Sequence, residues 1–378
     1  RQAQHPGQFA HAAGAVSAAA PGAGAAVEPG APGAPGAGPG DPGTVVEPGP
    51  LVEWYRRCAR DLPWRRPGIG PYAVLVCEVM SQQTPVARVE PVWREWMRRW
   101  PDPAALAGAP TAQVLRVWGR LGYPRRALRL IEAARAVVAE HGGALPEGYE
   151  ELLALPGVGP YTAGAVLAFA HGRRALALDT NARRVLARAV GGTALPPPSL
   201  GRAERERAEA LLPPDDAGAA LWSAAVMELG ALVCTAGDPR CGECPWRGRC
   251  AWVAAGRPPD EHAARRRRQA WHGTDRQARG LVMARLRETG PGQRVGREEL
   301  LAAAAAGTPA DAAAGASATV SDRAGDQADP RRPERAAPPR SERSSSTADP
   351  RRPERILAGL LADGLMATDD GGATYRLP

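Results

Sequence analysis

Residues 155–164 read LPGVGPYTAG, and the rest of the chain is interpreted around this stretch. A short apolar segment precedes it, and a run of small residues typical of a closely packed helix follows. Gly157 and Gly159 let the backbone turn sharply and approach another molecule closely. The first amides of the second helix have no partners inside the helix, so they offer a site for an anion. The stretch predicts either a helix–hairpin–helix that binds a phosphate or an ordinary turn between packed helices.

The hydrophobic pattern around this hairpin predicts an all-α fold. Apolar residues recur with a period near 3.6 over residues 89–100, 111–121 and 127–140, and no alternation typical of strands interrupts them. A further helix is expected to open near Leu51. The core of the region is expected to contain the large aromatic residues on these periodic faces, Trp93, Trp96 and Trp118.

Low-complexity segments separate the parts that are expected to fold. Residues 1–48 are rich in Ala, Gly and Pro, and residues 306–354 are rich in Ala, Pro, Ser, Arg and Asp, so both are predicted to be disordered. The sequence ADPRRPER occurs at 328–335 and again at 348–355, as in an expanded insert. Residues 254–305 and 355–378 flank this insert and predict a small winged-helix-like tail, with its last helix at 356–365 followed by a hairpin.

The composition limits the class of partner. The net charge is +8, and every basic residue is an arginine because the chain contains no lysine. This balance suits a polyanionic partner without identifying nucleic acid. No apolar run is long enough to span a membrane, and no signal peptide is evident. We expect a protein of the reducing cytoplasm.

Four of the six cysteines occur within seventeen residues, at positions 234, 241, 244 and 250. This clustering indicates metal ligation rather than a disulfide framework. Structural zinc usually shows two close cysteine pairs, whereas these unequal intervals favour a [4Fe–4S] cluster. The ligands would be Cys234, Cys241, Cys244 and Cys250, with zinc as the alternative.

Two carboxylates stand at positions where acid–base chemistry is plausible. Glu78 interrupts an apolar run, and burial there would raise its pKa as a general acid requires. An exposed glutamate bonded to an arginine is the alternative. Asp179 ends another apolar run where a helix begins, so it is expected to cap that helix and stay ionised. Arg183, Arg184 and Arg188 follow and could neutralise phosphates.

Taken together, these motifs resemble the helix-hairpin-helix DNA glycosylases, and within them the A/G-mismatch adenine DNA glycosylases of the MutY type. The resemblance covers residues 51–252, and residues 273–280 are also similar to a segment that follows the cluster in this family. The motifs that carry it are the hairpin, the four-cysteine loop, and the stretches at residues 62–64, 78–84, 121–123 and 178–181.

The resemblance implies a six-helix barrel domain at residues 72–178 and an iron–sulfur domain formed by residues 49–71 and 179–253. The active site would lie in the cleft between them. It also implies a partner, double-stranded DNA containing a mispaired adenine. The enzyme would act as a monomer, associated with the bacterial nucleoid through that DNA.

The resemblance also assigns roles to individual positions. Glu78 would protonate the flipped adenine, and Asp179 would stabilise the cationic sugar through a transient covalent link. Asn181 would support this chemistry, and Tyr161 would lie beside it. Gln83 would insert into the duplex, while Gly157, Val158 and Gly159 would bind a phosphate. Thr84 and Tyr123 would lie near the opposite base, and the adenine pocket would contain Trp64, Arg65 and Glu228.

Three features of the sequence bear on specificity. Relatives that also cut the strand carry a lysine where Tyr161 stands, so a chain without lysine should be monofunctional. We expect no counterpart within these residues of the Nudix-like tail with which family members recognise 8-oxoguanine. Ala224 replaces a glutamine of the adenine pocket. The preference for 8-oxoguanine over guanine therefore stays open.

Two other functions remain as alternatives. A related glycosylase could act on thymine mismatches or on oxidised pyrimidines. A catalytically silent DNA-binding protein could retain the same scaffold, although the presence of both Glu78 and Asp179 argues against it.

Overall fold

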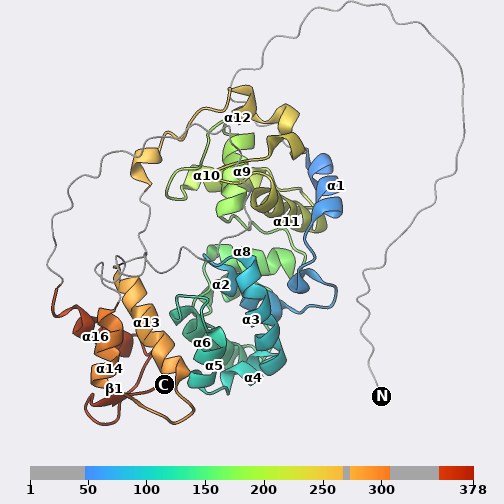
Figure 1. Cartoon of the computed structure of the whole chain (residues 1–378). Helices are drawn as coiled ribbons and strands as arrows, with labels where there is room; N and C mark the ends of the chain where they lie inside the picture. Colours follow the sequence, from blue (N-terminus) through green and yellow to red (C-terminus); the bar gives the residue numbers. More distant parts are fainter. Residues whose placement is uncertain (1–46, 267–272, 307–348) are drawn as a thin grey trace, which may run out of the picture. The chain divides into compact units, whose positions relative to one another are not determined.

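The computed structural model describes residues 47–266, 273–306 and 349–378. Helices dominate these ranges, and their one sheet has two short strands (Figure 1). The all-α prediction is confirmed. No helix in the described ranges is long and apolar enough to cross a bilayer.

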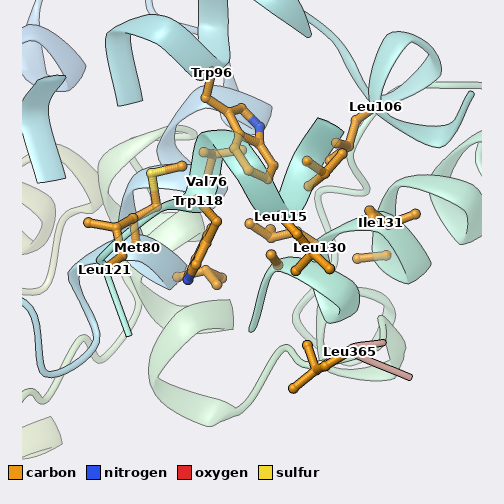
Figure 2. Packing of buried hydrophobic residues seen from close by; sticks show 14 of the residues in the cluster. Val76, Met80, Trp96, Leu106, Leu115, Trp118, Leu121, Leu130, Ile131 and Leu365 are labelled. Atoms are coloured by element: carbon orange, nitrogen blue, oxygen red, sulfur yellow. The ribbon is translucent and has the colours of Figure 1, made fainter. Parts of the chain in front are cut away.

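One group of helices follows the first helix and ends with the one that begins at the hairpin. Their bounds are α2 (Pro71–Ser81), α3 (Val86–Arg99), α4 (Pro103–Ala107), α5 (Thr111–Trp118), α6 (Arg125–Glu140), α7 (Tyr149–Ala154) and α8 (Pro160–Phe169). Trp96 and Trp118 are fully buried among these helices, and their rings pack edge to face with centres 5.8 Å apart (Figure 2). The predicted core tryptophans are thus confirmed as buried. Helix α2 is buried on every side, so its sequence is apolar almost throughout.

A second group combines the first helix with the chain that follows α8. It contains α1 (Pro48–Cys58), α9 (Thr180–Ala189), α10 (Arg202–Ala210), α11 (Asp216–Leu232), α12 (Ala251–Ala254) and the 3₁₀ turns η2 (Pro63–Arg65), η3 (Cys241–Glu243) and η4 (Arg247–Arg249). Leu51 and Trp54 of α1 pack in one apolar cluster with Val185, Trp222 and Trp246. Segments almost 200 residues apart in sequence therefore share a core.

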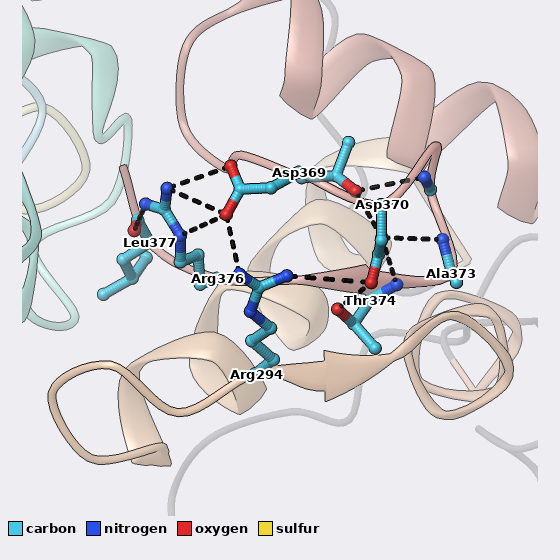
Figure 3. Close-up of polar contacts among 9 residues, drawn as sticks. Arg294, Asp369, Asp370, Ala373, Thr374, Arg376 and Leu377 are labelled. Atoms are coloured by element: carbon cyan, nitrogen blue, oxygen red, sulfur yellow. Dashed lines mark hydrogen bonds and ion pairs between the residues drawn. The ribbon is translucent and has the colours of Figure 1, made fainter.

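The C-terminal helices form a third group around the sheet. It comprises α13 (Asp275–Glu288), β1 (Val295–Gly296), α14 (Arg297–Ala305), α16 (Arg352–Ala362) and β2 (Thr374–Tyr375), preceded by η5 (Ala263–Arg265). The strands pair antiparallel, with Val295 opposite Tyr375. Asp370 accepts bonds from the turn at 368–374, and Asp369 binds Arg294 and Arg376 (Figure 3). The three helices expected for the winged-helix-like tail are present, but strand β1 between α13 and α14 was not predicted.

Predicted helix boundaries are wrong in detail, most clearly for the first and the last helix. The first helix begins at Pro48, because proline suits the first turn of a helix. The last helix begins at Arg352, so the end of the second ADPRRPER copy is helical, and Arg352 pairs with Asp275. Most of the predicted disorder at 1–48 and 306–354 lies outside the described residues.

Candidate active site

Glu78 lies in the interior of the protein on α2. Its side chain is 9% exposed, and Oε2 accepts a 2.7 Å hydrogen bond from the hydroxyl of Tyr161. Burial raises the pKa of Glu78 to about 7, although the Tyr161 bond and the Arg65 charge oppose the rise. The alternative of an exposed glutamate bonded to an arginine is therefore wrong. A carboxyl group with this pKa can hold a proton near neutral pH and donate it.

Tyr161 connects the hairpin to Glu78. It is the second residue of α8, directly after Pro160, so the turn at 155–159 sets its position. Burial raises the pKa of the Tyr161 hydroxyl well above its ordinary value, and the nearby Glu78 and Asp179 add to the rise. The hydroxyl thus keeps its proton and remains a hydrogen-bond donor to the glutamate.

The hairpin itself requires glycine. Gly157 has φ +79°, and a Cβ there would lie 2.7 Å from the Cβ of Arg129. Val158 bonds back to the carbonyl of Leu155, which closes the turn at 3.1 Å. No side chain caps the start of α8. Its first amides remain open to an anion such as a phosphate.

Asp179 is the N-cap of α9, as predicted. Its Oδ1 accepts from the amide of Ala182 at 2.6 Å, and its Oδ2 accepts from Nδ2 of Asn181 at 2.8 Å. Burial raises the pKa of Asp179 above its ordinary value, and these bonds reduce the rise without cancelling it. The expectation that capping would determine the charge of Asp179 did not include the free-energy cost of burying a carboxylate, which raises its pKa.

Two glycines allow helices to pack closely against the segment that carries Asp179. A Cβ on Gly164 of α8 would lie 2.1 Å from the carbonyl oxygen of Leu176. A Cβ on Gly230 of α11 would lie 2.7 Å from the Cβ of Asn181. Both helices therefore approach this segment at a distance that only glycine allows.

Hydrogen bonds continue from Asp179 to the cysteine loop. Asn181, which donates to Asp179, accepts through Oδ1 from Arg184 at 2.8 Å. Arg184 donates to the carbonyl of Cys234 at 2.7 Å, and Arg188 lies 3.4 Å from its sulfur. The carboxylate and the cysteine loop thus belong to one polar network.

The predicted phosphate role of the three arginines after Asp179 is wrong. Arg184 is 9% exposed and Arg188 is 3% exposed, and both donate to backbone carbonyls. Arg183 forms an ion pair with Glu204 at 2.6 Å. These guanidiniums are used inside the protein and are not available to a duplex.

The four clustered cysteines line one cavity, together with Arg188, Arg247 and Trp252. Within the described residues, no three acidic, histidine or cysteine side chains are arranged to hold a single metal ion. Four thiols that line one cavity fit the cluster that their unequal spacing predicts.

Glu228 on α11 is fully buried and bound by two arginines. Arg60 donates to it through its backbone amide and its guanidinium, and Arg65 donates to Oε2 at 2.8 Å. Burial alone would raise the pKa of Glu228, but the bonds from Arg60 and Arg65 lower it to about 2. Next to Arg65, the ring of Trp64 packs edge to face against that of Trp93, with the ring centres 5.6 Å apart.

The loop residues expected to contact DNA differ in exposure. Gln83 is exposed, and Tyr123 is 37% exposed. Thr84 is only 7% exposed, and its hydroxyl donates to the carbonyl of Leu121 at 3.2 Å. Thr84 therefore acts within the protein, and Gln83 and Tyr123 face outward.

Comparisons with known proteins agree with this geometry. Residues 76–210 match the model of the HhH-GPD superfamily base excision DNA repair proteins, and residues 234–250 match the iron-sulfur binding domain of endonuclease III. The chain is 53% identical over 240 residues to an adenine DNA glycosylase of Mycobacterium tuberculosis, which covers 63% of this chain and 77% of that relative. The chain belongs to the adenine DNA glycosylase family. Its cofactor is the iron–sulfur cluster.

Similarity extends beyond the adenine DNA glycosylases. A thymine-DNA glycosylase of Aeropyrum pernix is 37% identical over 205 residues, covering 53% of this chain and 92% of that relative. A solved structure of a thermostable thymine-DNA glycosylase matches with a TM-score of 0.49 and 25% identity, over 55% of this chain and 95% of that structure.

Two arginines at the site of this adenine DNA glycosylase family member were missed by sequence reasoning. Arg60 binds Glu228 across 168 residues, and Arg126 binds the loops that carry Gln83 and Tyr123. Neither stands in a motif, and the sequence holds so many arginines that no spacing distinguishes these two.

Proposed function

We propose that the protein removes adenine that is mispaired with guanine or 8-oxoguanine in double-stranded DNA. The observation that carries this proposal is that Glu78 and Asp179 both lie close enough to the Tyr161 hydroxyl to raise its pKa, with Glu78 bonded to it. Adenine leaves readily only after protonation, and its departure leaves a cationic sugar. One protonated and one ionised carboxyl group supply both requirements when their environments separate their pKa values.

The two carboxyl groups have unequal hydrogen-bond environments. Within the described residues, Glu78 is bonded only through the Tyr161 hydroxyl, whereas Asp179 is bonded by a backbone amide and by Asn181. Donors stabilise a carboxylate, so Asp179 is the group that stays ionised and Glu78 the one that holds a proton.

The reaction follows from these positions. The target adenosine leaves the stack and enters the site, as base-excising enzymes require. The proton of Glu78 passes to the adenine, and the bond between base and sugar breaks with its electron pair on the base. Asp179 stabilises the cationic sugar through a transient covalent link. Water then attacks C1′ of the sugar, displaces the Asp179 carboxylate and gives its proton to the now ionised Glu78, which leaves an abasic site.

The strand should stay intact after the base departs. Strand cutting in related enzymes proceeds through a lysine Schiff base, and this chain contains no lysine. Tyr161 occupies the corresponding position and is committed to Glu78. We therefore infer a monofunctional hydrolase. We propose further that it acts as a monomer in the bacterial cytoplasm.

The decisive experiment incubates the full chain with duplexes that carry adenine, thymine or an oxidised pyrimidine opposite guanine or 8-oxoguanine. We expect release of adenine alone, with strand breaks only after alkali. Release of thymine instead would favour the second candidate, which the Aeropyrum relative suggests. Breaks without alkali would contradict monofunctionality, and binding without any base release would indicate a silent DNA-binding protein.

The cluster is expected to hold the cysteine loop in shape. Cys234, Cys241, Cys244 and Cys250 would bind it, and when bound it would supply a rigid cross-link between α11 and the loop that follows. Replacing Cys241 with serine should remove iron and weaken duplex binding, as measured by metal analysis and by titration with labelled DNA. Cys58→Ser, at an exposed thiol, is the control and should keep its iron. Stoichiometric zinc in the wild type would overturn the cluster.

A further inference from the structure

Two residues of the DNA-facing loops have an unusual backbone conformation. Gln83 has φ +54° in the turn after α2, and Tyr123 has φ +47° in the turn after α5. Only one other non-glycine residue in the described ranges has a positive φ, Arg257. A left-handed conformation costs such a residue roughly 1 to 2 kcal/mol. The surrounding structure must therefore hold both turns in place.

The guanidinium of Arg126 lies between these two turns. Its Nη1 donates to the carbonyls of Val79 and Gln82, each at 2.7 Å, at the end of α2. Its Nη2 donates to the carbonyl of Gly122 at 3.0 Å and to the hydroxyl of Thr84 at 3.2 Å. Nη1 of Arg126 thus binds the Gln83 turn, and Nη2 binds both the Gln83 turn and the Tyr123 turn.

Aromatic rings complete the surroundings of this cation. The carbon of the guanidinium lies 5.2 Å from the centre of the Trp118 ring and 5.7 Å from that of Tyr123. Trp118 in turn donates through Nε1 to the carbonyl of Gly122 at 2.9 Å. Within the described residues, no carboxylate forms an ion pair with Arg126, and its Nε is buried without a partner.

Burying the charged guanidinium of Arg126 costs free energy. Burial lowers the pKa of Arg126 to about 10, so the protein loses free energy by holding it charged there. Carbonyl oxygens and ring faces offset part of that cost. Only a planar guanidinium offers donors in two directions at once, whereas a lysine would present one compact charge.

We propose that Arg126 is a positioning residue that fixes the Gln83 turn and the Tyr123 turn as one preformed unit for extruding the target base. This inference rests on the proposed base excision and adds the residue that prepares the loops for it. Opening a base pair costs a few kcal/mol, and this cost is lowest where the base is already unpaired. Preformed loops do not pay an ordering cost when they meet the duplex. Loss of Arg126 should therefore harm extrusion most where the flanking pairs are intact.

The test compares Arg126→Met with Arg135→Met, at an exposed arginine of the same helix. Single-turnover adenine release is measured on a duplex with paired flanks and on one whose adenine lies among several mispairs. Fluorescence of 2-aminopurine at the target position reports extrusion. We expect Arg126→Met to be slower by about 10- to 100-fold on the first duplex, the scale of a misplaced group. On the second duplex the loss should be much smaller, and Arg135→Met should match the wild type on both.

The outcomes separate the inference from the proposed function. Equal losses on the two duplexes, or unchanged fluorescence on the paired one, would overturn the role of Arg126. A wild type that releases no adenine from either duplex would instead overturn the proposed excision. If Arg126→Met fails to fold, as judged by thermal unfolding and iron content, Thr84→Val provides the second test. This change removes the hydroxyl that bonds Leu121 and accepts from Arg126, so it should show a smaller loss with the same dependence on the flanking pairs.

Discussion

Replacing Asp179 with asparagine is expected to slow adenine release by about 100- to 1000-fold, as loss of one electrostatic stabiliser does in other enzymes. The substitution keeps the shape of the side chain and one oxygen for the amide of Ala182. Asparagine is also a good N-cap, so α9 should keep its start. What disappears is the negative charge that faces the cationic sugar, together with the oxygen that accepts from Asn181. Neither loss removes a contact with the duplex backbone, so duplex binding should be retained.

The structure offers a matched control for this experiment. Asp215 caps α11 with the same geometry, accepting from the amide of Gly218 at 2.7 Å, but its side chain is exposed. Asp215→Asn should leave the rate unchanged. Single-turnover rates and duplex affinity for both variants decide the matter. Near-normal release by Asp179→Asn would rule out its assigned role.

Local sequence signals identified the residues whose surroundings are local. Glu78 stands out because a charge interrupts the apolar run of α2, and the structure buries that run on every side. Asp179 stands out because an apolar run ends where a helix begins, and it caps that helix. The two glycines of the hairpin mark a sharp turn, and Gly157 adopts a positive φ there. In each case a few neighbouring residues carry the signal, although the burial of Glu78 itself comes from helices packed around α2.

Contacts between residues that are distant in sequence could not be predicted from such local signals. The pairing of Arg60 with Glu228 depends on α1 packing against α11, which no spacing records. The inward direction of Arg184 was missed for the same reason, since a basic residue on a helix suggests solvent until its carbonyl partners are known. The pKa of Asp179 also depends on burial by helices from other parts of the chain.

The second large effect concerns Glu78 and combines activity with stability. Glu78→Gln should reduce adenine release by about 100-fold or more, because glutamine cannot donate the proton of a general acid. The wild-type rate should fall as the pH rises through about 7, the pKa that burial gives Glu78. The residual rate of the variant should show no such fall. Rates measured from pH 5 to 9 test both statements.

The same pKa determines the effect on unfolding. Between the ordinary pKa of 4.5 and about 7, the folded protein keeps a proton on Glu78 that the unfolded chain releases, so stability falls as the pH rises. The rise of the Glu78 pKa from 4.5 to about 7 corresponds to a loss of about 3 kcal/mol in the free energy of unfolding. Glutamine has no charge to bury and retains an oxygen for the Tyr161 hydroxyl, so the variant should gain thermal stability over the wild type at pH 8 and little at pH 4.5. Glu95→Gln, at a half-exposed carboxylate bound by Arg98 and Arg99, should bring no gain at pH 8. Equal stability of Glu78→Gln and the wild type at pH 8 would mean that Glu78 is not a buried acid poised to lose its proton.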